Sequence, residues 1–325
     1  MRRGWLALTV VRADTETADL PDRRRTIAVG AGVAVLGLAL VAWAWAGAGD
    51  GGMSLGEAAL LGLIEGLTEY LPVSSTGHLT VTQELLGITD TDRGREAANA
   101  YAVIIQAGAI TAVGYLYRAR LFDSFRSVLG SGSPDDRRLG LALVAGFVPA
   151  GLAGLLLGDV IKDRLFGIWP TVAAWAVGGV VLLVMARHER SGSRPLDAIT
   201  VRDGLLIGVA QMLALWPGTS RSLVTILGAL ALGFTLRAAV EFSFLLGFVT
   251  LGTATVYEAV QSGALVIDEF GWPAPLVGFV AATASAAFAV VWMLRYLERR
   301  GLGLFGWYRL ALAAVVGSLA LTVGL

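Results

Sequence analysis

Residues Gly62–His78 read Gly-Leu-Ile-Glu-Gly-Leu-Thr-Glu-Tyr-Leu-Pro-Val-Ser-Ser-Thr-Gly-His. The apolar first half of this stretch runs into proline, hydroxyl and glycine residues, so the segment 54–87 cannot form one straight helix. A second apolar segment, 203–234, is interrupted in the same manner by Leu215-Trp216-Pro217-Gly218-Thr219-Ser220-Arg221-Ser222. Both segments therefore predict two half-helices joined by a break.

The composition places these breaks in a membrane protein. Of the 325 residues, 56% are hydrophobic and 15% are charged, whereas soluble domains carry about 25% charged residues. A formal net charge of zero argues against a nucleic-acid partner. The absence of cysteine excludes disulfides, thiolate metal sites and cysteine nucleophiles. Six apolar stretches are long enough to cross a bilayer core about 30 Å thick: 98–117, 139–158, 169–187, 238–257, 274–296 and 307–325.

The first 52 residues stand apart from the rest of the sequence. Residues 1–26 mix charged and polar side chains without an apolar period and predict a cytoplasmic tail. The apolar stretch 27–48 follows Arg23, Arg24 and Arg25. This pattern favours an extra N-terminal transmembrane helix over a cleaved targeting segment.

Basic residues in the connections set the orientation, because arginine and lysine accumulate on the cytoplasmic side. Thirteen arginines fall in three connections that we predict to be inside: 118–138, 187–202 and 295–309. The second of these also holds His188, which we interpret as a surface residue. Four basic residues fall in the three connections that we predict to be outside: 88–97, 159–168 and 258–273.

With this orientation the two broken segments enter from opposite faces. The segment 54–87 must enter and leave from the outer face, and 203–234 from the inner face. The predicted fold is an all-α polytopic membrane protein with an inverted-topology repeat. Residues 53–190 and 203–325 each form one unit, a re-entrant helical hairpin plus three transmembrane helices. Non-helical backbone at membrane depth must be satisfied by protein or a wet cavity, so we expect the two breaks to meet and line one cavity.

Two carboxylates precede the first break. Glu65 and Glu69 are four residues apart and share one helical face. Inside a bilayer such a pair is costly unless it faces a polar cavity, a cation or an ionic partner. The alternative is that both pair with arginine or reach the membrane surface.

Hydroxyl residues and a histidine follow the first break. Ser74, Ser75 and Thr76 stand where the second half-helix would begin, and the free amides of a helix start favour anions. Gly77 would let the backbone approach a ligand closely. His78 comes next, and its neighbours favour a catalytic role over that of a hydrogen-bonded core residue.

The second break carries a cation. Arg221 stands beside Gly218, Thr219, Ser220 and Ser222 at a predicted helix start. A guanidinium in that setting suits bidentate phosphate binding. Its alternative role is as the structural partner of a carboxylate: Glu65, Glu69 or Glu241. Together the two breaks predict a buried site for the anionic head group of a lipid, with residue types that phosphoryl transfer requires.

Three strings carry a family resemblance. They are Glu65–His78, Leu213-Ala214-Leu215-Trp216-Pro217-Gly218-Thr219-Ser220-Arg221-Ser222, and Glu241-Phe242-Ser243-Phe244-Leu245-Leu246. From about residue 53 to its end the sequence closely resembles the undecaprenyl-diphosphate phosphatases, also called bacitracin-resistance phosphatases. One departure follows Ser222, where the family has Gly-Ala and this chain has Leu223-Val224.

The resemblance implies a reaction and its residues. It implies removal of the terminal phosphate of undecaprenyl diphosphate to give the monophosphate carrier recycled for cell-wall synthesis. Glu65 and Glu69 would bind a divalent cation or activate groups, and Arg221 would hold the diphosphate. Ser75 and His78 would serve in nucleophilic and proton-transfer roles. Our hypothesis places Ser75 at the attacking or positioning place and His78 in proton transfer.

The proposed reaction and the apolar composition also predict a cofactor, a location and partners. Hard oxygen ligands and a diphosphate suit Mg²⁺ or Ca²⁺ and not zinc. We expect a multi-pass protein of the plasma membrane, with the site open to the outer face and with membrane lipids and the isoprenyl diphosphate as partners. The oligomeric state stays open.

Two other functions compete with hydrolysis. A lipid-phosphate translocase would use the inverted repeats for alternating access, with or without phosphatase activity. A lipid phosphatase of the acid-phosphatase type would need two histidines in its site, and His78 is the one near these breaks.

Overall fold

The computed structural model of this chain describes residues 52–187 and 192–323. The predicted tail 1–26, the predicted extra helix 27–48 and His188 lie outside the described residues. Eleven α-helices form within the described part. They are α2 (Leu55–Thr68), α3 (Ser75–Leu85), α4 (Asp92–Leu116), α5 (Arg118–Val128), α6 (Pro134–Leu165), α7 (Ile168–Arg187), α8 (Val201–Gln211), α9 (Arg221–Ala231), α10 (Leu236–Phe270), α11 (Pro273–Arg300) and α12 (Gly303–Val323).

Six of the described helices are long and apolar enough to cross a membrane: α4, α6, α7, α10, α11 and α12. Each overlaps one of the six predicted stretches, which confirms an all-α polytopic membrane protein. The connections are more helical than predicted. The predicted inner connection 118–138 contains α5, and α10 continues through the predicted outer connection until Gly271, whose φ of 71° is left-handed.

Both broken segments divide into two helices, as their sequences predict. The first divides between Thr68 and Ser75, and the second passes through a short 3₁₀ turn, Met212–Leu215, before α9 begins at Arg221. Helix α2 begins with a capping box, in which Ser54 N–H donates to Glu57 Oε2 at 2.7 Å.

The second helix of each broken segment begins at a serine of unusual backbone. Ser74 and Ser220 have φ of 73° and 75°, and among the described residues they are the non-glycine residues with positive φ. Each hydroxyl accepts a hydrogen bond from the amide three residues along, at Gly77 and Leu223 respectively. This conformation is costly for a residue with a Cβ, so the surrounding contacts must hold it.

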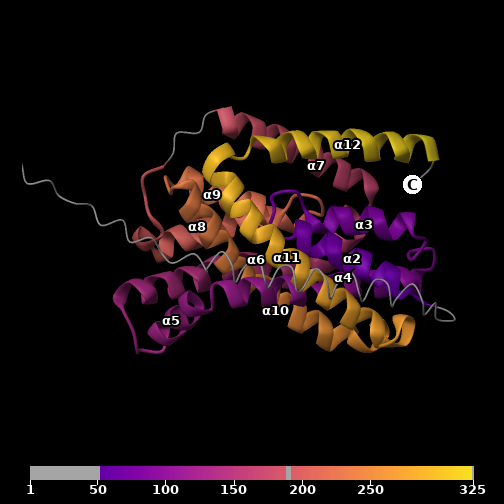
Figure 1. Ribbon diagram of the computed structural model, residues 1–325, viewed down its shortest axis with the longest axis horizontal. Coiled ribbons are helices and arrows are strands. Elements are labelled where there is room, and N and C mark those ends of the chain that lie inside the picture. The colour runs from indigo at the N-terminus through magenta and orange to yellow at the C-terminus, as the bar shows by residue number, and fades with distance from the viewer. Residues whose placement is uncertain (1–51, 188–191, 324–325) are drawn as a thin grey trace, which may run out of the picture.

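The broken segments lie toward opposite ends of the molecule. In Figure 1, α2 and α3 lie toward the right of the long axis and α8 and α9 toward the left. Helix α2 packs against α11 and α8 packs against α6, while α4 pairs with α10 and α7 with α12. The pairing therefore exchanges partners between the two halves of the chain.

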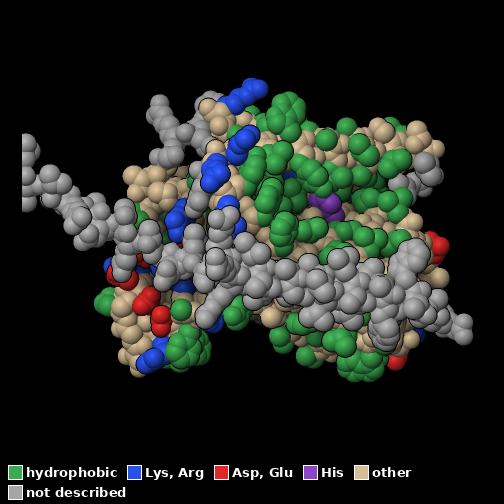
Figure 2. Space-filling view, in the orientation of Figure 1, with side chains coloured by type: hydrophobic (Ala, Val, Ile, Leu, Met, Phe, Trp, Pro, Cys, Tyr) green, Lys and Arg blue, Asp and Glu red, His purple; other side chains and the backbone are tan. Residues whose placement is uncertain are grey.

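Charge is concentrated at one end. Figure 2 shows most of the visible Arg and Lys side chains at the left, the end that holds α5, α8 and α9 in Figure 1. One arginine departs from the sequence prediction. Arg309, counted above in the inner connection 295–309, lies within α12 and its residue is 0% exposed. Its assignment to a connection was wrong, because backbone carbonyls inside the protein take the place of water around its guanidinium.

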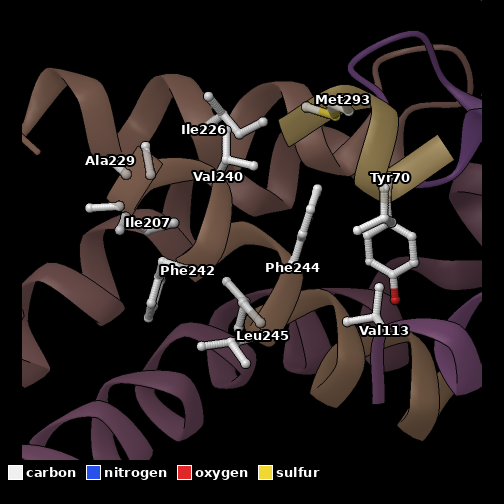
Figure 3. Packing of buried hydrophobic residues seen from close by; sticks show 14 of the residues in the cluster. Tyr70, Val113, Ile207, Ile226, Ala229, Val240, Phe242, Phe244, Leu245 and Met293 are labelled. Carbon is white, nitrogen blue, oxygen red and sulfur yellow. The ribbon is translucent and has the colours of Figure 1, made fainter. Parts of the chain in front are cut away.

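The largest buried cluster joins both halves of the chain. Figure 3 shows Tyr70 from the first break beside Phe244 of α10, with Val113 of α4 near the phenol. The Tyr70 and Phe244 rings meet edge to face, with centroids 5.1 Å apart. Such contacts between large rings stabilise the position of the first break against α10.

Candidate active site

A buried ion pair joins the two breaks. Glu69 follows the last residue of α2, and Arg221 is the first residue of α9. Arg221 Nη2 lies 3.1 Å from Glu69 Oε1, and the two side chains are 7% and 6% exposed. The structure thus brings together an acid and a cation that are 152 residues apart in sequence. Removing either partner would leave an uncompensated charge in the interior.

The same carboxylate binds a serine. The Ser75 hydroxyl donates a short hydrogen bond to Glu69 Oε2, so the two oxygens of Glu69 serve Ser75 and Arg221. Ser75 is the first residue of α3 and is buried. A carboxylate that accepts a serine proton can activate that hydroxyl as a nucleophile.

Two further groups hold the guanidinium of Arg221, and a glycine leaves room for it. Its Nη1 donates to the Ser243 carbonyl at 2.7 Å, and its Cζ stands 5.3 Å from the centre of the Tyr70 ring. Gly247 leaves the space that the guanidinium occupies, because a Cβ there would lie 2.2 Å from Nη1. Glu241, one of the partners considered for Arg221, instead lies 3.6 Å from Arg120.

Glu65 lies deeper in the protein. Glu65 is 0% exposed, and within the described part of the chain neither of its carboxylate oxygens has a hydrogen-bond partner. Ser75 is also near Glu65, but its hydroxyl is directed to Glu69. A carboxylate without a partner in such a place requires a proton or a cation.

His78 lies one helical turn beyond Ser74 and faces α12. Its Nδ1 is 2.6 Å from the Ser74 carbonyl oxygen, and its Nε2 is 2.8 Å from the Tyr308 hydroxyl. Trp175 of α7 packs edge-on, with ring centroids 5.3 Å apart. None of these described contacts joins His78 directly to Glu69 or Arg221.

The other predicted phosphate-binding hydroxyls divide into two groups. Ser74 and Ser220 cap α3 and α9, and Ser222 donates to the Leu71 carbonyl at 2.7 Å. These hydroxyls hold the breaks in shape. Thr76 and Thr219 are partly exposed.

The two predicted glycines fit against protein. A Cβ at Gly77 would lie 2.6 Å from Trp175 Cζ2, and one at Gly218 would lie 2.8 Å from the Thr171 carbonyl oxygen. Gly218 also has φ of 89°. Close packing against α7 therefore accounts for both glycines, whereas the sequence suggested close approach of a ligand to Gly77.

Arg309 is a residue of the site that the sequence did not predict. Its Nη1 donates to the Pro72 carbonyl at 3.3 Å, and its Nη2 donates to the carbonyls of Ala174 and Gly218, both at 2.8 Å. One side chain of α12 thereby holds both breaks. Gly178 leaves space for it, since a Cβ there would lie 2.3 Å from Nη2. The available signal was its position inside an apolar run.

This chain is similar to known undecaprenyl-diphosphatases over most of its length. An undecaprenyl-diphosphatase from Sorangium cellulosum (strain So ce56) is 43% identical over 265 residues, covering 80% of this chain and 84% of that protein. One from Methylococcus capsulatus is 42% identical over 269 residues, covering 81% and 94%. Undecaprenyl-diphosphatase 2 from Rhodospirillum rubrum is 43% identical over 263 residues, covering 80% and 93%.

The family assignment covers both breaks. The family model described as bacitracin resistance protein BacA matches residues 58–315, a range that contains every residue of the site described above. This chain belongs to the BacA bacitracin-resistance family.

Proposed function

We propose that this membrane protein removes the terminal phosphate of undecaprenyl diphosphate and leaves undecaprenyl phosphate. The observation that carries the proposal is the buried group of Ser75, Glu69 and Arg221, in a chain that is 42–43% identical to three undecaprenyl-diphosphatases. A hydroxyl, a proton acceptor and a phosphate-binding cation are the parts that transfer of a phosphoryl group requires.

Ser75 acts as the nucleophile in this proposal. Its oxygen forms a bond to the terminal phosphorus while its proton passes to Glu69. The bond from that phosphorus to the bridging oxygen breaks, and the lipid leaves as the monophosphate. Water then cleaves the phosphoserine and releases inorganic phosphate, and His78 transfers a proton in this cycle. A phosphohistidine trapped at His78 during turnover would reverse the roles of Ser75 and His78.

Arg221 has a different partner at each stage. In the structure it neutralises Glu69. When the diphosphate enters, its fork of N–H donors suits two phosphate oxygens, so it moves from a carboxylate to the substrate. The backbone amides at the start of α3 add donors of the same kind.

A Mg²⁺ or Ca²⁺ ion fits the acidic residues. Glu65 offers two buried oxygens that lack a hydrogen-bond partner within the described residues. Among those residues no three His, Asp or Glu side chains form a cluster, so the substrate would have to supply further oxygen ligands. We propose that Glu65, with Glu69, holds the cation, which would neutralise charge on the phosphates when bound.

The fold that serves this reaction is, in our proposal, an inverted-topology repeat. Helices α2 and α3 form one re-entrant hairpin and α8 and α9 form the other. Three features support it: the exchanged pairing of α2 with α11 and α8 with α6, the opposite positions of the hairpins in Figure 1, and the matching serines Ser74 and Ser220. The plasma membrane would hold the arginine-rich end of Figure 2 inside, so the first hairpin enters from the outer face.

Lipid translocation is the second candidate function, favoured by that exchanged pairing. Phosphate release from purified protein in detergent separates the two, because transport requires a membrane. We expect wild-type protein to release phosphate from undecaprenyl diphosphate with Mg²⁺. His78→Ala, Glu69→Gln and Arg221→Ala should each lower the rate at least a hundredfold.

A matched control tests whether these losses come from the site. Glu258→Gln changes another helical carboxylate, which accepts a hydrogen bond from Ser262 near the outer end of α10, and should retain activity. Wild-type protein that is folded in detergent yet releases no phosphate would overturn hydrolysis. Activity that survives chelation of divalent cations would leave Glu65 and Glu69 as proton acceptors or ionic partners only.

A further inference from the structure

Both ring nitrogens of His78 have a partner, and the partners differ in kind. Nδ1 lies 2.6 Å from the Ser74 carbonyl oxygen, which can only accept a hydrogen bond. Nδ1 must therefore carry the proton in the neutral ring, and Nε2 must carry the lone pair. Nε2 then accepts a hydrogen bond from the Tyr308 hydroxyl, 2.8 Å away.

Tyr308 also packs on the ring it binds. The two rings are nearly parallel, with an angle of 10° and centroids 5.7 Å apart. Trp175 contacts the same imidazole edge-on. Stacking on one side and an edge contact on another fix the ring plane, and the two hydrogen bonds fix its rotation.

Tyr308 is placed by the residue that follows it. Arg309 is fully buried and binds carbonyls of both breaks, so the backbone of α12 is fixed at this point. Tyr308 itself is 43% exposed. Figure 2 shows a histidine side chain at the surface among hydrophobic ones, and His78 is the histidine of the described residues. The Tyr308 side chain can thus rotate away from His78 Nε2 while the buried residues around Arg309 stay in place.

We propose that Tyr308 is a positioning residue, which holds neutral His78 with its lone pair on Nε2 and releases that nitrogen when a phosphate group arrives. This rests on the proposed function. It assigns Nε2 as the reacting atom of His78, whether the histidine transfers a proton or attacks phosphorus. Nδ1 keeps its bond to Ser74 throughout.

The chain offers a direct spectroscopic test, because it has two histidines. In a His188→Gln background, ¹⁵N-histidine labelling gives the NMR signals of His78 alone. We expect a protonated Nδ1 and an unprotonated Nε2. Tyr308→Phe keeps the stacked ring and removes the hydroxyl, so the Nε2 resonance should move to higher frequency while Nδ1 changes little.

Kinetics give the second measurement. Tyr308→Phe should lower kcat about tenfold, the effect of one lost hydrogen bond, and leave KM nearly unchanged because Arg221 still binds the diphosphate. Tyr257→Phe, an exposed tyrosine of α10, is the matched control and should change neither measurement.

Each outcome is decisive for this inference. A proton on Nε2 in the wild-type background would overturn it, as would an Nε2 signal that Tyr308→Phe leaves in place. A rise in KM with unchanged kcat would make Tyr308 a binding residue instead. If wild-type protein released no phosphate, the proposed function would fail, while the NMR experiment would still decide how Tyr308 holds His78.

Discussion

The breaks at 69–74 and 215–220 shape the chain in the same way and carry different chemistry. In each, a serine with φ near 75° caps the following helix with its own hydroxyl. The first helical residue is Ser75 in one hairpin and Arg221 in the other, and both bind Glu69. The backbone arrangement thus occurs twice, whereas each hairpin supplies one part of the reacting group.

The acids nearest a break belong to the first hairpin. Glu65 and Glu69 precede Ser74 by nine and five residues, and the same steps back from Ser220 reach Gln211 and Leu215. Gln211 is buried like Glu65, but it is neutral and its Nε2 lies 3.3 Å from Thr250 Oγ1. A shared backbone therefore does not make the hairpins equivalent sites. Substitutions in the two hairpins test this difference.

Arg221→Ala should have the largest effect on stability. It leaves Glu69 buried without its cation, which should lower the free energy of unfolding by about 3–5 kcal/mol. The double variant Glu69→Gln, Arg221→Ala removes both charges and should recover part of that loss without recovering activity. Denaturant unfolding in detergent measures the first effect, and phosphate release measures the second.

An exposed ion pair provides the control for Arg221. Arg93 lies 2.9 Å from Glu269, and the Arg93 side chain is 60% exposed. Arg93→Ala should lower the free energy of unfolding by less than about 1 kcal/mol. If Arg221→Ala cost no more than Arg93→Ala, the ion pair would not be what joins the two hairpins.

Gly247→Ala should have the second largest effect on stability. The added Cβ would lie 2.2 Å from Arg221 Nη1, so the guanidinium must move from its place between the hairpins. We expect a loss of about 1–3 kcal/mol in the free energy of unfolding and a loss of phosphate release. Gly252→Ala, in the same helix with no atom within 4 Å of its added Cβ, should lose neither. Equal behaviour of the two variants would contradict the role given to Gly247.

The two capping serines should respond alike to substitution. Ser74→Ala and Ser220→Ala each remove a cap while keeping a Cβ at positive φ, which should cost about 0.5–2 kcal/mol. Glycine tolerates that backbone, so Ser74→Gly and Ser220→Gly should cost a few tenths of a kcal/mol. Thermal unfolding of the four variants checks this. A large difference between the hairpins would show that they do not share one backbone arrangement.

Glu65→Gln should have the smallest effect on stability. It gives the first hairpin the same residue type as Gln211 and removes a charge that lacks a hydrogen-bond partner within the described residues. We expect no loss of stability, because an unpaired buried carboxylate is costly and glutamine has the same shape without the charge, with at least a hundredfold loss of phosphate release and of its response to Mg²⁺. Retained activity with an unchanged Mg²⁺ response would remove Glu65 from the proposed cation site.

Much of the fold could be predicted because its signals are local. Six apolar stretches mark the helices long enough to span a membrane, and proline with hydroxyl residues marks each break. The serines before Ser75 and Arg221 mark where the second half-helices begin. Helix ends were less predictable, since the connections 118–138 and 258–273 contain helix that charge and hydropathy do not distinguish from a loop.

The site was predicted in part for the same reason. Glu65 and Glu69 share a face because helical geometry places residues four apart together. Tyr308 and Arg309 were not predicted, because their partners are remote: Tyr308 contacts a residue 230 positions away and Arg309 one 237 positions away. Arg309 also follows a group of arginines in the chain, so by charge alone it was assigned to the inner connection.

The apolar helices and the position of each break follow from local sequence, because they depend on neighbours within a few positions. The contact of Glu69 with Arg221 is visible in the folded chain alone. The same holds for the Ser243 carbonyl that binds the guanidinium, for the space that Gly247 leaves, and for the reach of α12 to both breaks. The physical reason is that a buried charge must find its donors and acceptors wherever folding brings them. For these residues the partners lie on other helices, which no local pattern specifies.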